Sequence, residues 1–97
     1  MKDIKLASET IHQNLKNLPD WDVIDEIKIN KTFKFENFLE AIDFVNKIAK
    51  IAEKNQHHPD IHIYYNQVNI ELWSHSVKGL TEKDFILANQ IEDILKA

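Results

Sequence analysis

The sequence predicts an α+β fold in which helices pack on one face of a four-stranded antiparallel sheet. Two segments alternate apolar and polar residues with the period of two that is typical of strands, residues 21–35 and 61–73. Three segments repeat apolar residues at every third or fourth position, as amphipathic helices do, residues 1–18, 37–54 and 81–95. The predicted order is helix, hairpin, helix, hairpin, helix, and strands joined by tight turns pair antiparallel. Because the chain has 97 residues and no evident linker or repeat, we expect one small domain spanning residues 1–97.

The first helix is expected within residues 1–18, where the apolar spacing is helical. The residues that carry this pattern are Ile4, Ala7, Ile11, Leu15 and Leu18. Ser8 is a candidate N-cap for the ordered part of the helix, and Pro19-Asp20 is expected to end it.

The first hairpin begins with Trp21 and Val23, which share one face of a strand. A polar turn is expected at Asp25-Glu26. The odd positions of the second strand then form a buried face, Ile27, Ile29, Phe33 and Phe35.

The second helix is expected over residues 37–54, with Asn37 as its N-cap. One apolar stripe consists of Phe38, Ala41, Val45, Ile48 and Ala52. A second apolar set widens this surface, Leu39, Ile42, Phe44, Ala49 and Ile51. So broad an apolar surface predicts burial on two sides, against the sheet and against another subunit. The alternative interpretation is that the additional apolar side chains are half-exposed.

The second hairpin and the last helix complete the order. Strands over residues 61–65 and 68–73 are expected to be joined by a turn at Asn66-Gln67. The last helix is predicted to start with a variant of the capping box, Thr81-Glu82-Lys83-Asp84. Its apolar positions are Phe85, Ala88, Ile91 and Leu95.

Composition excludes several classes of function. All 12 basic residues are Lys, against 16 acids, so the net charge of -4 argues against a direct nucleic-acid binder. With no Cys there is no disulfide framework or thiolate metal site, and with one Gly there is no glycine-rich phosphate loop. No apolar run approaches the roughly 18 residues of a membrane span, and the polar start MKDIKLASE does not resemble a secretory signal. We therefore expect a cytoplasmic protein without a membrane partner.

Histidine is the unusual feature, because four of the five His lie within nineteen positions. Pro59 disfavours helical geometry at His58, so the second helix should end there. In a hairpin that turns near residue 66, His75 lies across from a residue near 58, which brings His57, His58 and His75 to one end of the sheet. Grouped imidazoles can supply both a base and an acid near neutral pH.

Less specific interpretations stand beside this one. A single His at a helix end, such as His57 or His58, often only complements the helix dipole. His12 and His62 are expected to be bystanders. Four imidazoles could hold a metal, but their spacing matches no standard zinc signature, so no metal site is predicted. Ser74 and Ser76 lack the context of a nucleophilic serine.

The pattern of these residues resembles the pterin-4a-carbinolamine dehydratase family, whose eukaryotic members double as dimerisation cofactors of a homeodomain transcription factor. The family motif corresponds here to Glu53, His57-His58-Pro59, Tyr65, His75 and Asp84 with matching gaps. Trp21, the segment TFKFENFLEAIDF at 32–44 and the segment from Gly79 to Ala88 also match. The resemblance covers residues 6–95.

This resemblance implies removal of water from a 4a-hydroxytetrahydropterin to give the quinonoid dihydropterin, which recycles the cofactor of aromatic amino-acid hydroxylases. It implies that one of His57 and His75 acts as the acid and the other as the base, in an order that the sequence does not determine. It also implies that His58 holds or polarises the pterin and that no cofactor is needed. The implied substrate-binding residues are Glu53, Pro59, Asp60, Ser74, Asp84 and Trp21. For Trp21, a core position in the first hairpin is the alternative.

Two positions depart from the family pattern, and both are expected to bear on affinity or substrate range. Ile61 stands where many members have an aromatic residue, and Ser76 stands where many have Asp or Glu. Ser74 keeps the hydroxyl that members have there as Thr.

The resemblance also implies a homodimer formed at a sheet edge or a homotetramer formed through helices. Two alternatives to the dehydratase stay open. One is a non-catalytic dimerisation or interaction module, and the other is a role on a different pterin, such as molybdopterin.

Overall fold

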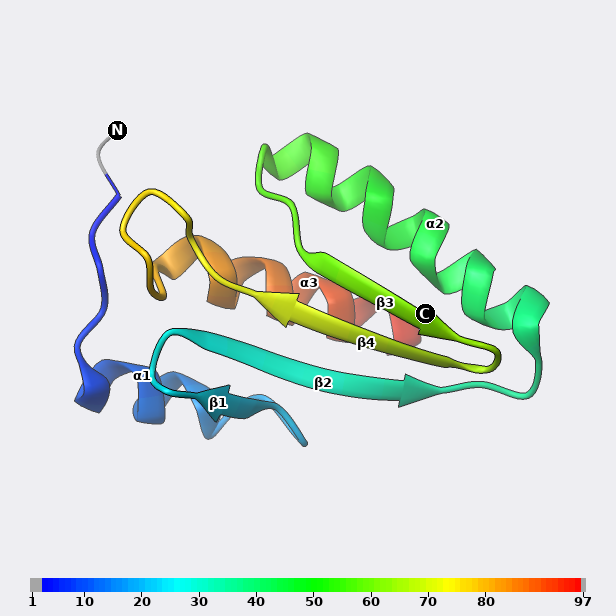
Figure 1. Cartoon of the computed structure of the whole chain (residues 1–97), viewed down its shortest axis with the longest axis horizontal. Helices are drawn as coiled ribbons and strands as arrows, with labels where there is room; N and C mark the ends of the chain where they lie inside the picture. The colour runs from blue at the N-terminus through cyan, green and yellow to red at the C-terminus, as the bar shows by residue number, and fades with distance from the viewer. Residues whose placement is uncertain (1–2, 97) are drawn as a thin grey trace.

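The computed structural model describes residues 3–96. This part of the chain folds into seven elements: α1 (Ser8–Leu15), β1 (Asp22–Ile24), β2 (Lys28–Lys34), α2 (Phe38–Asn55), β3 (Asp60–Tyr64), β4 (Gln67–Leu72) and α3 (Glu82–Lys96). The strands form one antiparallel sheet in the order β1-β2-β4-β3. Figure 1 shows α3 running behind the strands and α2 lying along the β3 side. The predicted α+β class is confirmed.

Helix α1 is shorter than its apolar pattern predicts. It begins at Ser8, so Ser8 is the first helical residue, and the prediction that it caps the helix is wrong. Ala7 is the N-cap and has an extended backbone, and the Leu6 N–H before it donates to the Leu80 carbonyl oxygen at 2.7 Å. Leu18, beyond the end of the helix, is nevertheless buried in the core.

The two hairpins turn on residues with left-handed backbone. Asp25 and Glu26 have φ of 53° and 55°, the pair of positive φ values that a tight type I′ turn requires, so the first predicted turn is confirmed. The second turn is Tyr65-Asn66, one residue earlier than predicted, because Tyr64 pairs with Gln67. Two hydrogen bonds with Phe35 hold Asn66 in this turn. The Phe35 N–H donates to the Asn66 carbonyl oxygen at 2.8 Å, and the Asn66 side-chain amide donates to the Phe35 carbonyl oxygen at 3.0 Å.

Helix α2 starts after Asn37, whose side chain accepts a hydrogen bond from the Glu40 N–H at 2.9 Å, as predicted. The residues that it buries are Ala41, Phe44, Ile48 and Ala52. Phe44, from the second apolar set, therefore belongs to the core. Phe38 and Leu39 at the start of the helix are instead 48% and 79% exposed.

One core lies between the sheet and the helices. Alternate positions of the two central strands point into it, Ile29, Phe33, Val68, Ile70 and Leu72. They meet residues from all three helices, among them Ile11, Phe44, Ile48, Leu87 and Ile91. Within residues 3–96, no helix is both long enough and apolar enough to cross a bilayer.

Ile70 on β4 has no exposed surface, whereas Ile86 on α3 is 50% exposed. Truncating Ile70 to Ala should lower the free energy of unfolding by about 2–5 kcal/mol, because it removes buried methyl groups and leaves a cavity. Urea denaturation measures the loss, with Ile86→Ala as the matched control, for which we expect a change below about 0.5 kcal/mol. Equal losses in the two variants would contradict the assignment of β4 to the centre of the core.

Candidate active site

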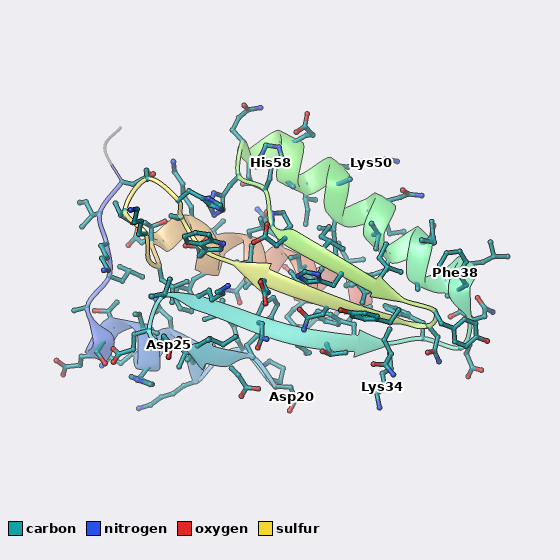
Figure 2. All side chains as sticks on the ribbon, in the orientation of Figure 1. Asp20, Asp25, Lys34, Phe38, Lys50 and His58 are labelled. Carbon is teal, nitrogen blue, oxygen red and sulfur yellow. The ribbon has the colours of Figure 1, made fainter. Side chains whose placement is uncertain are left out.

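The three histidines singled out by the sequence gather at one end of the sheet around an open depression of about 420 Å³. The predicted site residues that line it are His57, His58, Pro59, Asp60, Ser74 and His75. Figure 2 labels His58 at this end of the molecule, where the chain leaves α2. The volume lies within the range of about 300–1,000 Å³ that small-molecule sites occupy.

The end of α2 determines where His57 and His58 lie. Gln56 caps the helix in the left-handed region, with φ 53° and ψ 38°, and the His57 N–H donates to the Ala52 carbonyl oxygen at 3.1 Å. Pro59 follows at once and prevents a further helical turn. The two imidazoles are therefore displayed on a short connection between α2 and β3.

His57 is held by a buried carboxylate. Its Nε2 lies 2.5 Å from Oδ1 of Asp84, and the His57 side chain is only 13% exposed. Asp84 itself has no exposed surface. Its other oxygen, Oδ2, accepts hydrogen bonds from the Ser74 hydroxyl and the Thr81 N–H, both at 2.9 Å. The bond to Thr81 is the carboxylate half of the predicted capping box.

His58 is held differently, at the surface. Its Nε2 contacts the carboxylate of Glu53, and the two side chains are 59% and 73% exposed. Glu53 does not itself line the depression, but it lies in the last turn of α2 and contacts an imidazole that does. Because both side chains are exposed, their contact contributes little to the free energy of folding, and the pair is free to rearrange around a ligand.

His75 is held by stacking. Its ring lies on the indole of Trp73, with centroids 3.8 Å apart and planes inclined by 29°. The Trp73 Nε1–H in turn donates to Oδ2 of Asp60 at 3.1 Å. Each imidazole of the site is thus supported by a different acid. The contact with the carboxylate is direct for His57 and His58, whereas His75 is connected to its acid through the indole of Trp73.

Trp73 is the site residue that the sequence pattern did not single out. Along the sequence it alternates with the apolar Val68, Ile70 and Leu72, on the same parity as the polar Asn69 and Glu71. A large aromatic residue at such a position, two residues before a His, is the signal that could have identified it. Gln56, Asp3 and Lys83 also line the depression.

Trp21 does not lie in the depression. It is 5% exposed, packs edge-to-face on Phe33 at 6.0 Å, and donates from Nε1 to Oε2 of Glu92 at 2.9 Å. The Glu92 carboxylate also accepts from Nζ of Lys31 at 2.7 Å. These contacts place Trp21 in the core, the alternative role that its position in the first hairpin allowed.

The other two histidines lie apart from the depression. His12 is an exposed residue of α1, and His62 on β3 is 3.9 Å from the Glu71 carboxylate. Within residues 3–96, no three His, Asp or Glu side chains are arranged to hold a metal ion. The imidazoles that line the depression can transfer protons and form hydrogen bonds.

Comparisons with known proteins agree on one family. The family model described as pterin 4 alpha carbinolamine dehydratase matches residues 4–94. A protein of Picosynechococcus sp. named "Putative pterin-4-alpha-carbinolamine dehydratase" is 47% identical over 90 residues, which cover 93% of this chain and 97% of the relative.

Two solved structures share the fold. A crystal structure described as a transcriptional coactivator/pterin dehydratase from Brucella melitensis matches with a TM-score of 0.90 and 34% identity, covering 94% of this chain and 98% of that one. A pterin dehydratase-like protein described as a RuBisCO assembly factor in the α-carboxysome matches with a TM-score of 0.65 and 21% identity, over 76% of this chain and 87% of that one. At that identity, the second likeness shows the fold alone.

Replacing Asp84 by Ala should lower the free energy of unfolding by about 3 kcal/mol or more, because it leaves the His57, Ser74 and Thr81 donors unpaired in the interior. Urea denaturation at neutral pH measures the change. The matched control is Asp93→Ala on the same helix, whose side chain is 71% exposed. We expect the control to stay within about 0.5 kcal/mol of the parent protein. A similar small effect at Asp84 would contradict its role as the buried acceptor.

Proposed function

The chain belongs to the pterin-4a-carbinolamine dehydratase family, and from this premise we propose that it removes water from a 4a-hydroxytetrahydropterin to give the quinonoid dihydropterin. The observation that supports the proposal best is the arrangement of His57, His58 and His75 around one depression, with His57 on a buried carboxylate. This reaction needs proton removal and proton delivery, and imidazoles perform both near neutral pH.

The proposed step is an elimination in which no electrons are gained or lost overall. The bond from C4a to the hydroxyl oxygen breaks after that oxygen receives a proton, and the oxygen leaves as water. N5 loses its proton to a base, and the electrons of that N–H bond complete the C4a=N5 double bond. We assign these two proton transfers to His57 and His75.

His57 is suited to one of the transfers by its contact with Asp84. When Nε2–H donates to the carboxylate, Nδ1 is the ring nitrogen that can exchange a proton with a ligand. The carboxylate then stabilises the imidazolium that forms during the reaction, as a buried acid does behind a catalytic His. His75, exposed and stacked on Trp73, reaches the depression from the loop that follows β4.

The remaining residues are proposed to bind the pterin. His58, on the rim with its Glu53 partner, holds or polarises the ring system. Pro59 and the half-buried Asp60 form the neighbouring wall. We expected Ser74 and Asp84 to contact the substrate, but both are buried and hydrogen-bonded to each other. We propose that they act from beneath the depression by fixing the position of His57.

We further propose that the reaction serves cofactor recycling for aromatic amino-acid hydroxylases in the cytoplasm.

Replacing His57 or His75 by Ala should lower kcat by about 10²–10⁴ each, the usual contribution of a general acid or base. The double variant should proceed at the uncatalysed rate. The decay of the ultraviolet signal of freshly generated 4a-hydroxytetrahydropterin measures this, and His12→Ala serves as the exposed-histidine control. Full activity of the double variant would show that these imidazoles do not carry the reaction. An inactive parent protein that retains a stoichiometric protein partner would favour an interaction module instead.

We also propose that the chain acts as a homo-oligomer. Strand β3 pairs with β4 alone among the described residues and so forms an edge of the sheet. Exposed apolar side chains lie on β3, on the turn after it and at the start of α2, including Ile63, Tyr64, Tyr65, Phe38 and Leu39. Burial of such a surface against a second copy would supply core area that a small chain lacks.

Light scattering coupled to size exclusion should give two or four times the mass of the chain. Ile63→Lys on β3 and Leu39→Lys on α2 should each reduce the mass if the corresponding surface is the interface, because a charge cannot be buried there without a partner. Gln13→Lys, at an exposed neutral residue of α1, changes the net charge by the same +1 and serves as the control. A monomeric parent protein at micromolar concentration would contradict the proposal.

A further inference from the structure

The segment before α1 reaches the candidate active site from the far end of the sequence. The Leu6 N–H donates to the Leu80 carbonyl oxygen at 2.7 Å, which ties the segment to the stretch that precedes α3. Lys5 crosses directly over Gly79, where an added Cβ would lie 2.6 Å from the Lys5 Cε atom. Residues 3–7 therefore lie close against the loop that follows His75.

Within this segment, Asp3 lies on the rim of the depression. Its Oδ2 accepts a hydrogen bond from the Ser76 hydroxyl at 2.5 Å, and its Oδ1 lies 2.8 Å from Nζ of Lys83. Its side chain is 19% exposed, and all three residues line the depression together with His57 and His75. The pKa of Asp3 lies below its usual value, chiefly because Lys83 and Ser76 donate hydrogen bonds to the carboxylate. Asp3 is therefore charged at neutral pH.

The loop that carries His75 has few other supports. Its backbone closes on itself, with hydrogen bonds from Ser74 N–H to the Gly79 carbonyl oxygen at 2.8 Å and from Gly79 N–H back to Ser74 at 3.3 Å. Within residues 3–96, the bond from Ser76 to Asp3 is the only hydrogen bond from a side chain of residues 75–78 to another segment. His75 itself is otherwise held by stacking on Trp73.

We propose that Asp3 is a positioning residue, which fixes the loop through Ser76 and thereby aims the His75 imidazole into the depression. This inference rests on the proposed dehydratase function. It assigns a task in the reaction to the segment before α1, 72 positions away from the histidine it orients. Asp3 acts through Ser76, so it should affect the rate of the chemical step more than the affinity for the pterin.

The test is a double-variant cycle on the full chain, with Asp3→Ala, Ser76→Ala and the two together. Each single variant should lower kcat by about tenfold and change KM by less than about twofold. This loss of rate lies within the roughly hundredfold that a misplacement of about 1 Å can cause. The double variant should be no slower than Asp3→Ala, because both changes break one contact. Asp3→Glu, which keeps the carboxylate, should recover part of the loss.

The control is Asp43→Ala, which removes an exposed carboxylate paired at 3.2 Å with Lys47 on α2. A kcat of Asp3→Ala within about twofold of this control would overturn the inference, and so would losses that multiply in the double variant.

Hydrogen exchange provides a readout that does not depend on activity. The amides of Val77, Lys78 and Gly79 donate within the loop and should exchange faster in Asp3→Ala than in Asp43→Ala. A lower kcat without faster exchange would also overturn the inference, because Asp3 would then act by another route. If the parent protein shows no dehydratase activity, the proposed function fails, and the exchange measurement alone decides whether Asp3 fixes this loop.

Discussion

The buried carboxylate of Asp84 is the constraint on which the site depends. It lies without exposed surface at the start of α3 and accepts from His57 after α2, from Ser74 after β4 and from Thr81 at the helix N-cap. Three segments separated along the chain therefore meet at one group. Burying a charge is costly unless hydrogen-bond donors compensate it. A shift of any one segment would therefore leave the Asp84 carboxylate short of a donor in the interior.

Much of the fold could be predicted from the sequence, because its signals are local. The Asn37 cap, the Asp25-Glu26 turn and the end of α2 before Pro59 each depend on adjacent residues. The errors occurred where a distant partner decides the outcome. The segment before Ser8 is bound to the stretch before α3 through Leu6 and Leu80, and Asn66 in the second turn is bound to Phe35.

The site shows the same division between local and tertiary information. The hairpin alone indicates that His57, His58 and His75 lie near one another, since antiparallel pairing fixes which ends meet. The only sign of the support that Trp73 gives to His75 is an aromatic residue two positions before a His. Sequence spacing carries no information about Asp3, whose place depends on how the segment before α1 crosses Gly79. It also left Trp21 undecided between pocket and core, which only its contacts with Phe33 and Glu92 resolve.

The unequal exposure of the three imidazoles argues for unequal tasks. A buried ion pair adds little net stability compared with apolar packing, so the interior placement of Asp84 has its clearest physical effect on the orientation of His57. His57, at 13% exposure, must therefore receive a ligand at a nearly fixed geometry, whereas His58, at 59%, can follow the ligand's outline. A proton transfer gains most from a fixed donor or acceptor, and binding tolerates a mobile one. The difference in burial between His57 and His58 thus supports the division of tasks proposed above, with proton transfer at His57 and pterin binding at His58.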